Sequence, residues 1–123
     1  MKGDEMAFER FEKKGGRHSD PRVSINAAGQ ITLNRATVDK YFKNKKFVDL
    51  YFDKEKRCVG IKPADKETDD AFKLTSNKIQ SNSSFSGRSF LKNYGIDYKN
   101  AKQYIPSWND KEEMLIIKVG QKD

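Results

Sequence analysis

The sequence predicts a mostly β fold with short helices, arranged as a small pseudo-twofold β-barrel built from two ββαββ-like repeats. Three observations lead to this prediction. Short alternating or β-branched apolar runs are separated by glycine-containing or charged turns, as in antiparallel strands. Two brief helical patterns each follow such a strand. The order of helix, strand, charged turn and strand then occurs twice within 123 residues.

The first repeat, residues 22–63, opens with two short strands on either side of a turn at Gly29, which adopts a positive φ without steric cost. The inward strand positions are Val23, Ile25, Ile31 and Leu33. Asn34 is a suitable N-cap for the helix that follows, because its side chain accepts hydrogen bonds from the free amides of the first turn. The buried helix face consists of Val38, Tyr41 and Phe42.

The first repeat closes with a β-hairpin. Residues 47–53, "FVDLYFD", are rich in aromatic and β-branched residues and predict a strand. The charged turn "DKEKR" leads to the strand "CVGIKP", which we expect to end at Pro63. We place Cys58 at an inward position of this strand, as a buried core residue rather than a reactive thiol.

An acidic connector, residues 64–72, leads to the second repeat, residues 73–120. Its opening is weakly patterned and is interpreted as a strand followed by a loop. A short helix ends at Gly95, and its inward positions are Phe90, Leu91 and Tyr94. "AKQYIPSW" contains Pro106, so we expect an edge strand or a bulge there. After a second charged turn, "MLIIKV" is the final strand.

The second half aligns with the first at two offsets, 53 residues up to the helix and 56 residues beyond a three-residue insertion. Equivalent residues are Arg35 with Arg88, Val38 with Leu91 and Tyr41 with Tyr94 at the first offset, and Phe52 with Trp108 and Cys58 with Met114 at the second. We interpret this as a duplication. One unit of about 40 residues cannot bury its own sheet face, whereas two units can close a barrel and remove exposed edges.

The segment from Val23 to Pro63, with its strand, glycine turn, short helix and charged hairpin, resembles the AbrB-like or MazE-like swapped-hairpin (SpoVT-AbrB) family. That family usually has Arg after the turn glycine and Pro before the helix, where this chain has Gln30 and Asn34. The resemblance implies a cradle-loop barrel and DNA binding by a transcription regulator or antitoxin. Family members are usually homodimers of one repeat, which two tandem repeats in one chain would imitate. Related duplicated barrels also include enzymes and protein-binding modules.

Charge is clustered along the chain, whose net charge is +7. Residues 35–48 carry +4 and residues 73–102 carry +5, whereas residues 49–72 carry −2. Such basic blocks can recruit polyanions, with affinity that falls as salt rises. The resemblance implies DNA more readily than RNA as this polyanion. The alternative is that a lysine-rich surface only maintains solubility.

The candidate nucleic-acid-binding residues are basic side chains from both repeats and the N-terminal tail, residues 1–21. In the first repeat they are Arg35, Lys40, Lys43, Lys45 and Lys46; in the second they are Arg88 and Lys92, with Lys99 and Lys102 beside them; in and next to the tail they are Lys13, Lys14, Arg17 and Arg22. The lysines also fit a helix C-terminus, where the dipole favours cations. Arg35 is the stronger candidate, because a cation in the first turn opposes the dipole and recurs as Arg88.

The sequence does not indicate an enzyme. His18 is the single histidine and Cys58 the single cysteine, so we expect no catalytic site, no metal site and no cofactor. The chain contains no run of eighteen apolar residues and no secretory h-region, which predicts a cytoplasmic protein without a membrane segment.

We therefore expect a non-enzymatic, transcription-regulator-like DNA-binding protein, as a monomeric pseudo-dimer or a homodimer. The alternative is a protein-interaction or assembly module, such as a phage, mobile-element or ribonucleoprotein component, that binds a protein or RNA. Exposure of three aromatic residues would favour this alternative, namely Tyr98, Tyr104 and Trp108.

Overall fold

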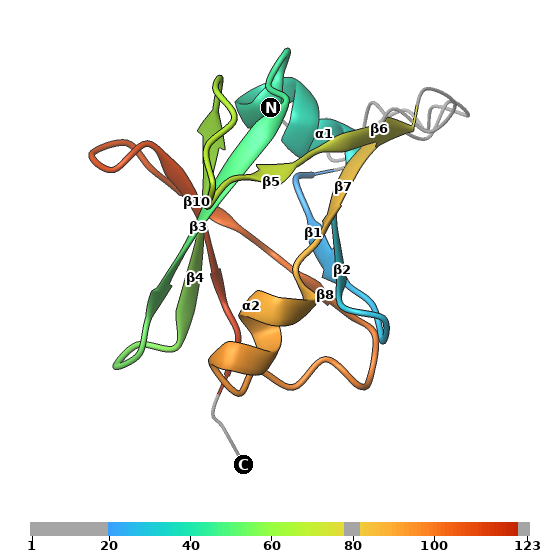
Figure 1. Ribbon diagram of the computed structural model, residues 1–123, viewed down its shortest axis with the longest axis vertical. Coiled ribbons are helices and arrows are strands. Elements are labelled where there is room, and N and C mark those ends of the chain that lie inside the picture. The colour runs from blue at the N-terminus through green and yellow to red at the C-terminus, as the bar shows by residue number, and fades with distance from the viewer. Residues whose placement is uncertain (1–19, 78–81, 121–123) are drawn as a thin grey trace, which may run out of the picture.

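The computed structural model describes residues 20–77 and 82–120 and consists mainly of two five-stranded antiparallel sheets (Figure 1). Sheet A contains, in spatial order, β6 (Thr75–Asn77), β7 (Asn82–Ser86), β2 (Gln30–Leu33), β1 (Val23–Ile25) and β8 (Lys102–Tyr104). Sheet B contains β5 (Phe72–Lys73), β3 (Phe47–Asp53), β4 (Cys58–Ala64), β10 (Met114–Lys118) and β9 (Ser107–Asn109). The prediction of a mostly β protein with few short helices is confirmed.

Two segments of the chain pass from one sheet to the other without a helix between the strands. β5 and β6 are separated by Leu74 alone, and β8 and β9 by Ile105 and Pro106. The Leu74 amide donates to the Lys46 carbonyl at 2.8 Å, just before β3 begins. β8 and β9 are edge strands, as the proline predicts. Within the described residues the hydrogen-bonded ladders remain two separate sheets rather than one closed barrel.

The first helical segment is α1 (Arg35–Thr37), which continues as the π-helical turn η3 (Val38–Phe42). Its predicted cap is confirmed, because Asn34 Oδ1 accepts from the Thr37 amide at 3.0 Å. The buried Thr37 hydroxyl accepts from the Arg22 amide at 2.9 Å and donates to the Arg22 carbonyl at 3.0 Å. These bonds fix the start of β1 against the helix.

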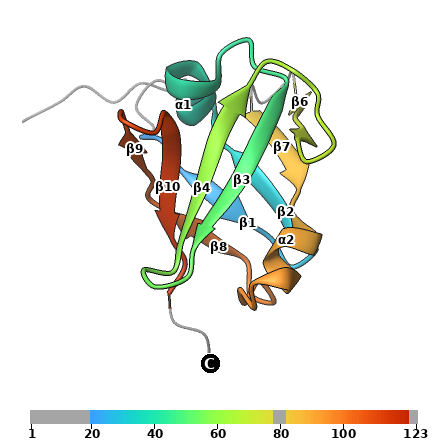
Figure 2. The same cartoon turned by 60° about the vertical axis from the view of Figure 1, so that its left-hand side comes forward.

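The second helix, α2 (Arg88–Asn93), lies at the other end of the molecule from α1, as Figures 1 and 2 both show. It is followed by Gly95, whose φ is +64°. The Arg57 guanidinium reaches over from the β3–β4 turn and donates to the Tyr94 and Gly95 carbonyls at 3.2 and 3.4 Å. A cation therefore satisfies acceptors at the C-terminus of this helix.

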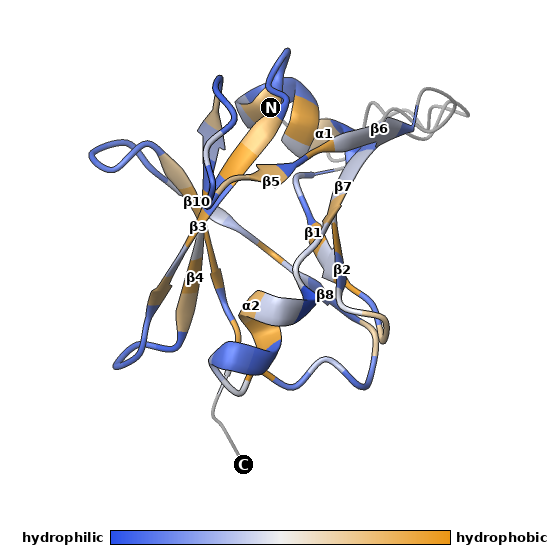
Figure 3. Ribbon diagram, in the orientation of Figure 1, coloured by the Kyte–Doolittle hydropathy of each residue, from blue (hydrophilic) through white to orange (hydrophobic). Residues whose placement is uncertain are grey.

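The hydrophobic core lies between the two sheets. Its fully buried side chains are Val23, Ile25, Ile31 and Leu33 from sheet A, Val48, Val59, Ile61, Leu115 and Ile117 from sheet B, and Phe42 and Leu91 from the helical segments. Figure 3 shows hydrophobic residues on strands of both sheets and hydrophilic turns between the strands of sheet B. Each such side chain contributes about 1.5–3 kcal/mol when it is fully buried.

Two equivalent aromatic contacts connect the halves of the chain. Tyr41 stacks on Trp108 with ring centroids 4.7 Å apart and planes at 10°. Tyr94 packs on Phe52 at 4.6 Å. The two tyrosines are equivalent at the offset of 53, and Phe52 and Trp108 are equivalent at the offset of 56. In each contact, an aromatic residue of the helical region in one half packs on a strand of the other.

The two charged turns of sheet B have the same local structure. Asp53 Oδ1 accepts from the Lys56 amide at 3.0 Å, and Asn109 Oδ1 accepts from the Glu112 amide at 2.9 Å. Each turn ends in a residue with φ of 55°, Arg57 in one and Glu113 in the other. An Asx side chain that accepts from its own turn is a common way to reverse the chain.

Several local predictions are corrected. Cys58 and Met114 are not inward: Val59 and Ile61 are buried, so alternation turns Cys58 and Gly60 outward, and Leu115 does the same for Met114. β4 does not end at Pro63 but continues to Ala64, because Pro63 pairs with Val48 within the ladder. The opening of the second repeat is not a strand and a loop but includes β5, β6 and β7.

Candidate nucleic-acid interface

Arg35 and Arg88 lie at opposite ends of one strand pair. β2 runs into Arg35, β7 runs into Arg88, and the two strands are antiparallel neighbours that pair from Gln30 with Ser86 to Leu33 with Ser83. The turn before β2 contacts the second arginine, since a Cβ on Gly29 would lie 2.7 Å from Arg88 Cβ. Gly29 and Arg35 are six residue steps apart along an extended segment, which corresponds to about 20 Å.

The surface between the arginines is polar and uncharged. Alternation turns Gln30 and Thr32 outward, because Ile31 and Leu33 are buried. Cross-strand pairing extends the Thr32 position into a row that crosses all five strands of sheet A, formed by Gln103, Ser24, Thr32, Ser84 and Thr75. Gln30 Nε2 donates to Ser84 Oγ at 2.9 Å. The outer face of sheet A is therefore an array of hydroxyl and amide groups.

These groups fit the chemistry of a nucleic-acid backbone. Serine, threonine and glutamine side chains donate hydrogen bonds to phosphate and sugar oxygens, while arginine supplies charge and paired donors. A distance of about 20 Å corresponds to roughly six phosphates along one strand of a duplex. The row was missed by the sequence analysis, because only strand pairing brings these separate residues into register.

The first-repeat candidates differ in their exposure and in whether an acidic side chain contacts them. Arg35 is exposed and its Nε lies 3.6 Å from Asp39 Oδ2, whereas Lys45 Nζ is bonded to Asp65 Oδ1 at 2.8 Å. Lys40, Lys43 and Lys46 are exposed around η3 and its C-terminus. Lys40 Nζ lies 5.5 Å from the centroid of the Tyr41 ring. Lys45 thus serves a surface ion pair, while the other lysines present their charge to solvent.

The second-repeat candidates are all exposed and lie away from the first set. Arg88 and Lys92 lie on α2, while Lys99 and Lys102 follow it. Lys92 borders a pocket of about 490 Å³ together with Lys54 and Arg57 of the β3–β4 turn, two basic residues absent from the predicted set. The predicted basic residues therefore form two groups at the two ends of the molecule rather than one cluster (Figure 2).

Of the candidates in and next to the tail, the structure describes Arg22. Arg22 is half-buried, and its guanidinium donates to the Pro21 carbonyl at 2.8 Å and lies 4.0 Å from Asp20. Arg17, Lys13 and Lys14 lie outside the described residues. Arg22 is thus held against the body of the protein by its backbone bonds to Thr37 and Asn34.

The aromatic residues that would favour the alternative function are not freely exposed. Tyr104 is buried in the core, and Tyr98 and Trp108 are half-buried against it. Burial, and secondarily the Asp97 carboxylate, raise the pKa of Tyr104 above its ordinary value of 10.0. Among the residues that the structure describes, the exposed aromatic residue is instead Tyr51, half of whose surface is accessible on the outside of sheet B.

Over the part of the chain that the structure describes, no group of three histidine, cysteine or acidic residues is placed to hold a metal ion. Nor is any helix in that part long and apolar enough to cross a membrane. No family model, curated protein or solved structure matches this chain.

Proposed function

We propose that this chain is a non-enzymatic DNA-binding protein of the AbrB-like type that contacts a duplex with the outer face of sheet A. The observation that carries the proposal is the placement of Arg35 and Arg88 at opposite ends of the β2–β7 pair, with an uncharged polar row between them. In this arrangement the arginines bind phosphates and the hydroxyl and amide groups position the backbone. The exposed lysines add sequence-independent attraction.

The proposal includes a barrel made of two repeats. The segments that pass between the sheets at β5–β6 and β8–β9 support it, as do the equivalent turns at Arg57 and Glu113. A pseudo-twofold axis between the repeats relates the arginine after β2 to the arginine after β7. A single chain would thereby present two symmetry-related arginines, as a dimer of a one-repeat protein with one such arginine would.

The test is a salt titration of duplex binding with matched charge variants. Arg35→Gln and Arg88→Gln each remove one phosphate contact, so each should lower the slope of log K against log salt by about 1, and the double variant by about 2. The matched control is Lys111→Gln, which removes one exposed charge in the β9–β10 turn of sheet B.

Fluorescence anisotropy between about 50 and 200 mM salt measures these slopes, with circular dichroism to verify that each variant is folded. A folded protein that fails to bind duplex DNA at low salt would overturn the proposal. If the control lowered the salt slope as much as the arginine variants, the outer face of sheet A would not be the DNA-binding surface.

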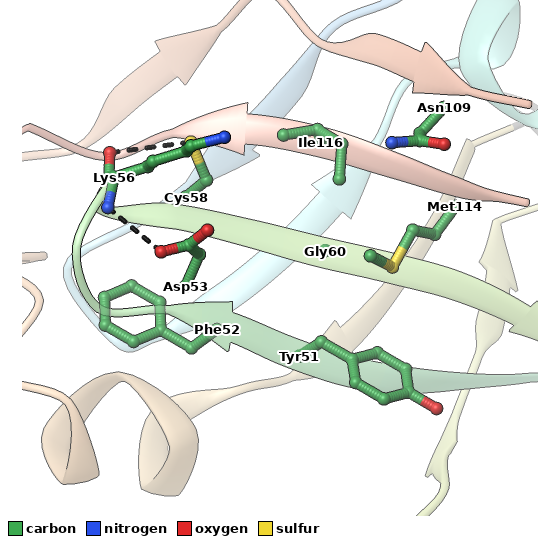
Figure 4. A pocket seen from close by; sticks show the side chains of 9 residues that line it. All are labelled: Tyr51, Phe52, Asp53, Lys56, Cys58, Gly60, Asn109, Met114 and Ile116. Carbon is green, nitrogen blue, oxygen red and sulfur yellow. Dashed lines mark hydrogen bonds between the residues drawn. The ribbon is translucent and has the colours of Figure 1, made fainter. Parts of the chain in front are cut away.

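The second candidate function is a protein-interaction or assembly module. The observation that favours it is the half-exposed Tyr51 on the apolar outer face of sheet B, close to Met114 and Ile116 (Figure 4). Stoichiometric co-purification with one polypeptide or RNA, without duplex binding, is the result expected for this function.

A further inference from the structure

The outer face of sheet B is patterned differently from that of sheet A. Strand register assigns its outward residues to three rows. The first row is Asp49, Lys62, Met114 and Asn109; the middle row is Tyr51, Gly60, Ile116 and Ser107; the last row begins with Asp53, Cys58 and Lys118. The centre of the face is thus apolar, with acidic residues on β3 and lysines on β4 and β10.

The centre of this face forms an open pocket of about 440 Å³ (Figure 4). Met114 lies over Gly60, since a Cβ on Gly60 would be 2.6 Å from the Met114 sulfur. Tyr51 and Ile116 line the pocket on either side of Gly60. A solvated sheet face normally carries polar residues, and methionine adapts readily to a partner surface. These features are typical of a contact surface.

We propose that this face is the contact between two copies of the chain, related by a twofold axis that runs along β4 in the plane between the sheets. The axis lays β4 of one copy on β4 of the other, and β3 on β10. Asp53 then lies opposite Lys118 and Tyr51 opposite Ile116, and each of these contacts occurs twice. Two sheets packed in this aligned way lie about 10 Å apart.

Charge complementarity in the last row favours this axis, because it gives both Asp53 and Lys118 an opposite charge. An axis midway between β4 and β10 would set Lys118 against Cys58, and one midway between β3 and β4 would set Asp53 against Cys58, so each would desolvate a charge without a partner. An axis perpendicular to the strands through the middle row would set Asp49 against Asp53, two like charges. The axis along β4 leaves Lys62 facing its own copy and Asp49 facing Met114, but Asp49 and Lys62 are direct cross-strand neighbours within one copy.

The dimer leaves the proposed DNA-binding surface free. The core lies between the two sheets, so their outer faces point in opposite directions (Figure 1). Two copies joined through sheet B therefore carry two sheet A faces on opposite sides of the assembly. This arrangement of binding faces rests on the proposed function. It implies that one dimer binds two separate duplex segments, rather than two sites on the same segment.

Sedimentation velocity over a concentration series tests the dimer, using the full chain. Lys118→Glu places an acidic group opposite Asp53 twice in the dimer, and we expect the dissociation constant to rise about tenfold or more. The double variant K118E/D53N removes that repulsion and should recover part of the loss. Asn at position 53 keeps the acceptor of the turn, as Asn109 does in the other turn. Lys99→Glu, the same charge change on an exposed loop after α2, should leave the dissociation constant unchanged.

Cross-linking at Cys58 gives an independent measurement. Cys58 is the single cysteine of the chain and lies beside the proposed axis, so it faces its own copy. A bis-maleimide, to which each thiol adds across one double bond, should yield a covalent dimer with the parent chain and with K99E but little with K118E. A protein that remains monomeric up to about 1 mM, or a dimer unaffected by K118E, would overturn the proposal. DNA binding by such a monomer would leave the proposed function standing.

Discussion

The two sheets bury similar side chains and expose very different ones. Inward, sheet A presents residues such as Ile31 and Leu33 and sheet B residues such as Ile61 and Leu115, all fully buried. Outward, sheet A carries uncharged hydroxyl and amide groups, whereas sheet B carries an apolar centre with charged residues around it. The inward residues are what the fold requires, so the proposals for the two faces rest on their outward residues.

The largest expected effect is that of Gly29→Ala in the turn before β2 of sheet A, compared with Gly60→Ala in β4 of sheet B. Gly29→Ala should cost about 2–3 kcal/mol of unfolding free energy, because Gly29 has φ of +84° and its Cβ would lie 2.9 Å from the Arg88 backbone. Gly60→Ala should cost less than about 1 kcal/mol, since the atom in the way is the mobile end of Met114. Urea unfolding measures both. Equal losses would show that the two glycines are not constrained differently.

Exchanging the character of the two outer faces should separate their activities. Thr32→Val removes one hydroxyl from the centre of the sheet A row, and we expect duplex affinity to fall about 2–10-fold with self-association unchanged. Ile116→Thr should weaken self-association and leave duplex affinity unchanged. Both residues point outward, so stability should change by no more than about 0.5–1 kcal/mol. Anisotropy and sedimentation together distinguish this outcome from a general loss of folding.

The smallest expected effect is a loss of stability at high pH. Since the pKa of Tyr104 is raised in the folded state, the unfolded chain loses this proton first as pH rises above the ordinary value of 10.0. The folded state then binds more protons, and stability falls as pH rises from there through the folded pKa. Tyr104→Phe should remove this component, so the parent and variant should differ in slope above about pH 10 and agree in slope between pH 8 and 9. Unfolding free energies across that range measure the difference.

Local patterns predicted most of the strands correctly because alternation and turn chemistry are local. "FVDLYFD" is β3 at its predicted bounds, and Asn34 caps α1 as its side chain suggests. The prediction for "CVGIKP" was wrong at Cys58, which lies on the outer face of the sheet rather than in the core. Apolar or small residues occupy both faces of this strand, so alternation alone cannot decide which face is buried. The inward face is identified by Ile61, which is fully buried beside its partner Leu115 in β10.

The candidate site was less predictable because it depends on distant pairings. The basic blocks identified Arg35 and Arg88, but the Lys45–Asp65 ion pair joins residues far apart in sequence. The hydroxyl row of sheet A is unremarkable in any one strand. Arg57 looked like an ordinary turn residue, although it caps a helix of the other half.

The stacking of Tyr41 on Trp108 and of Phe52 on Tyr94 has a consequence for how the chain folds. Each contact needs both halves, as do the pairings of β2 with β7 and β4 with β10. Contacts of such long sequence separation form slowly, because a large loop must close before they stabilise anything. During synthesis β2 and β4 are therefore made well before their second-half partners, β7 and β10.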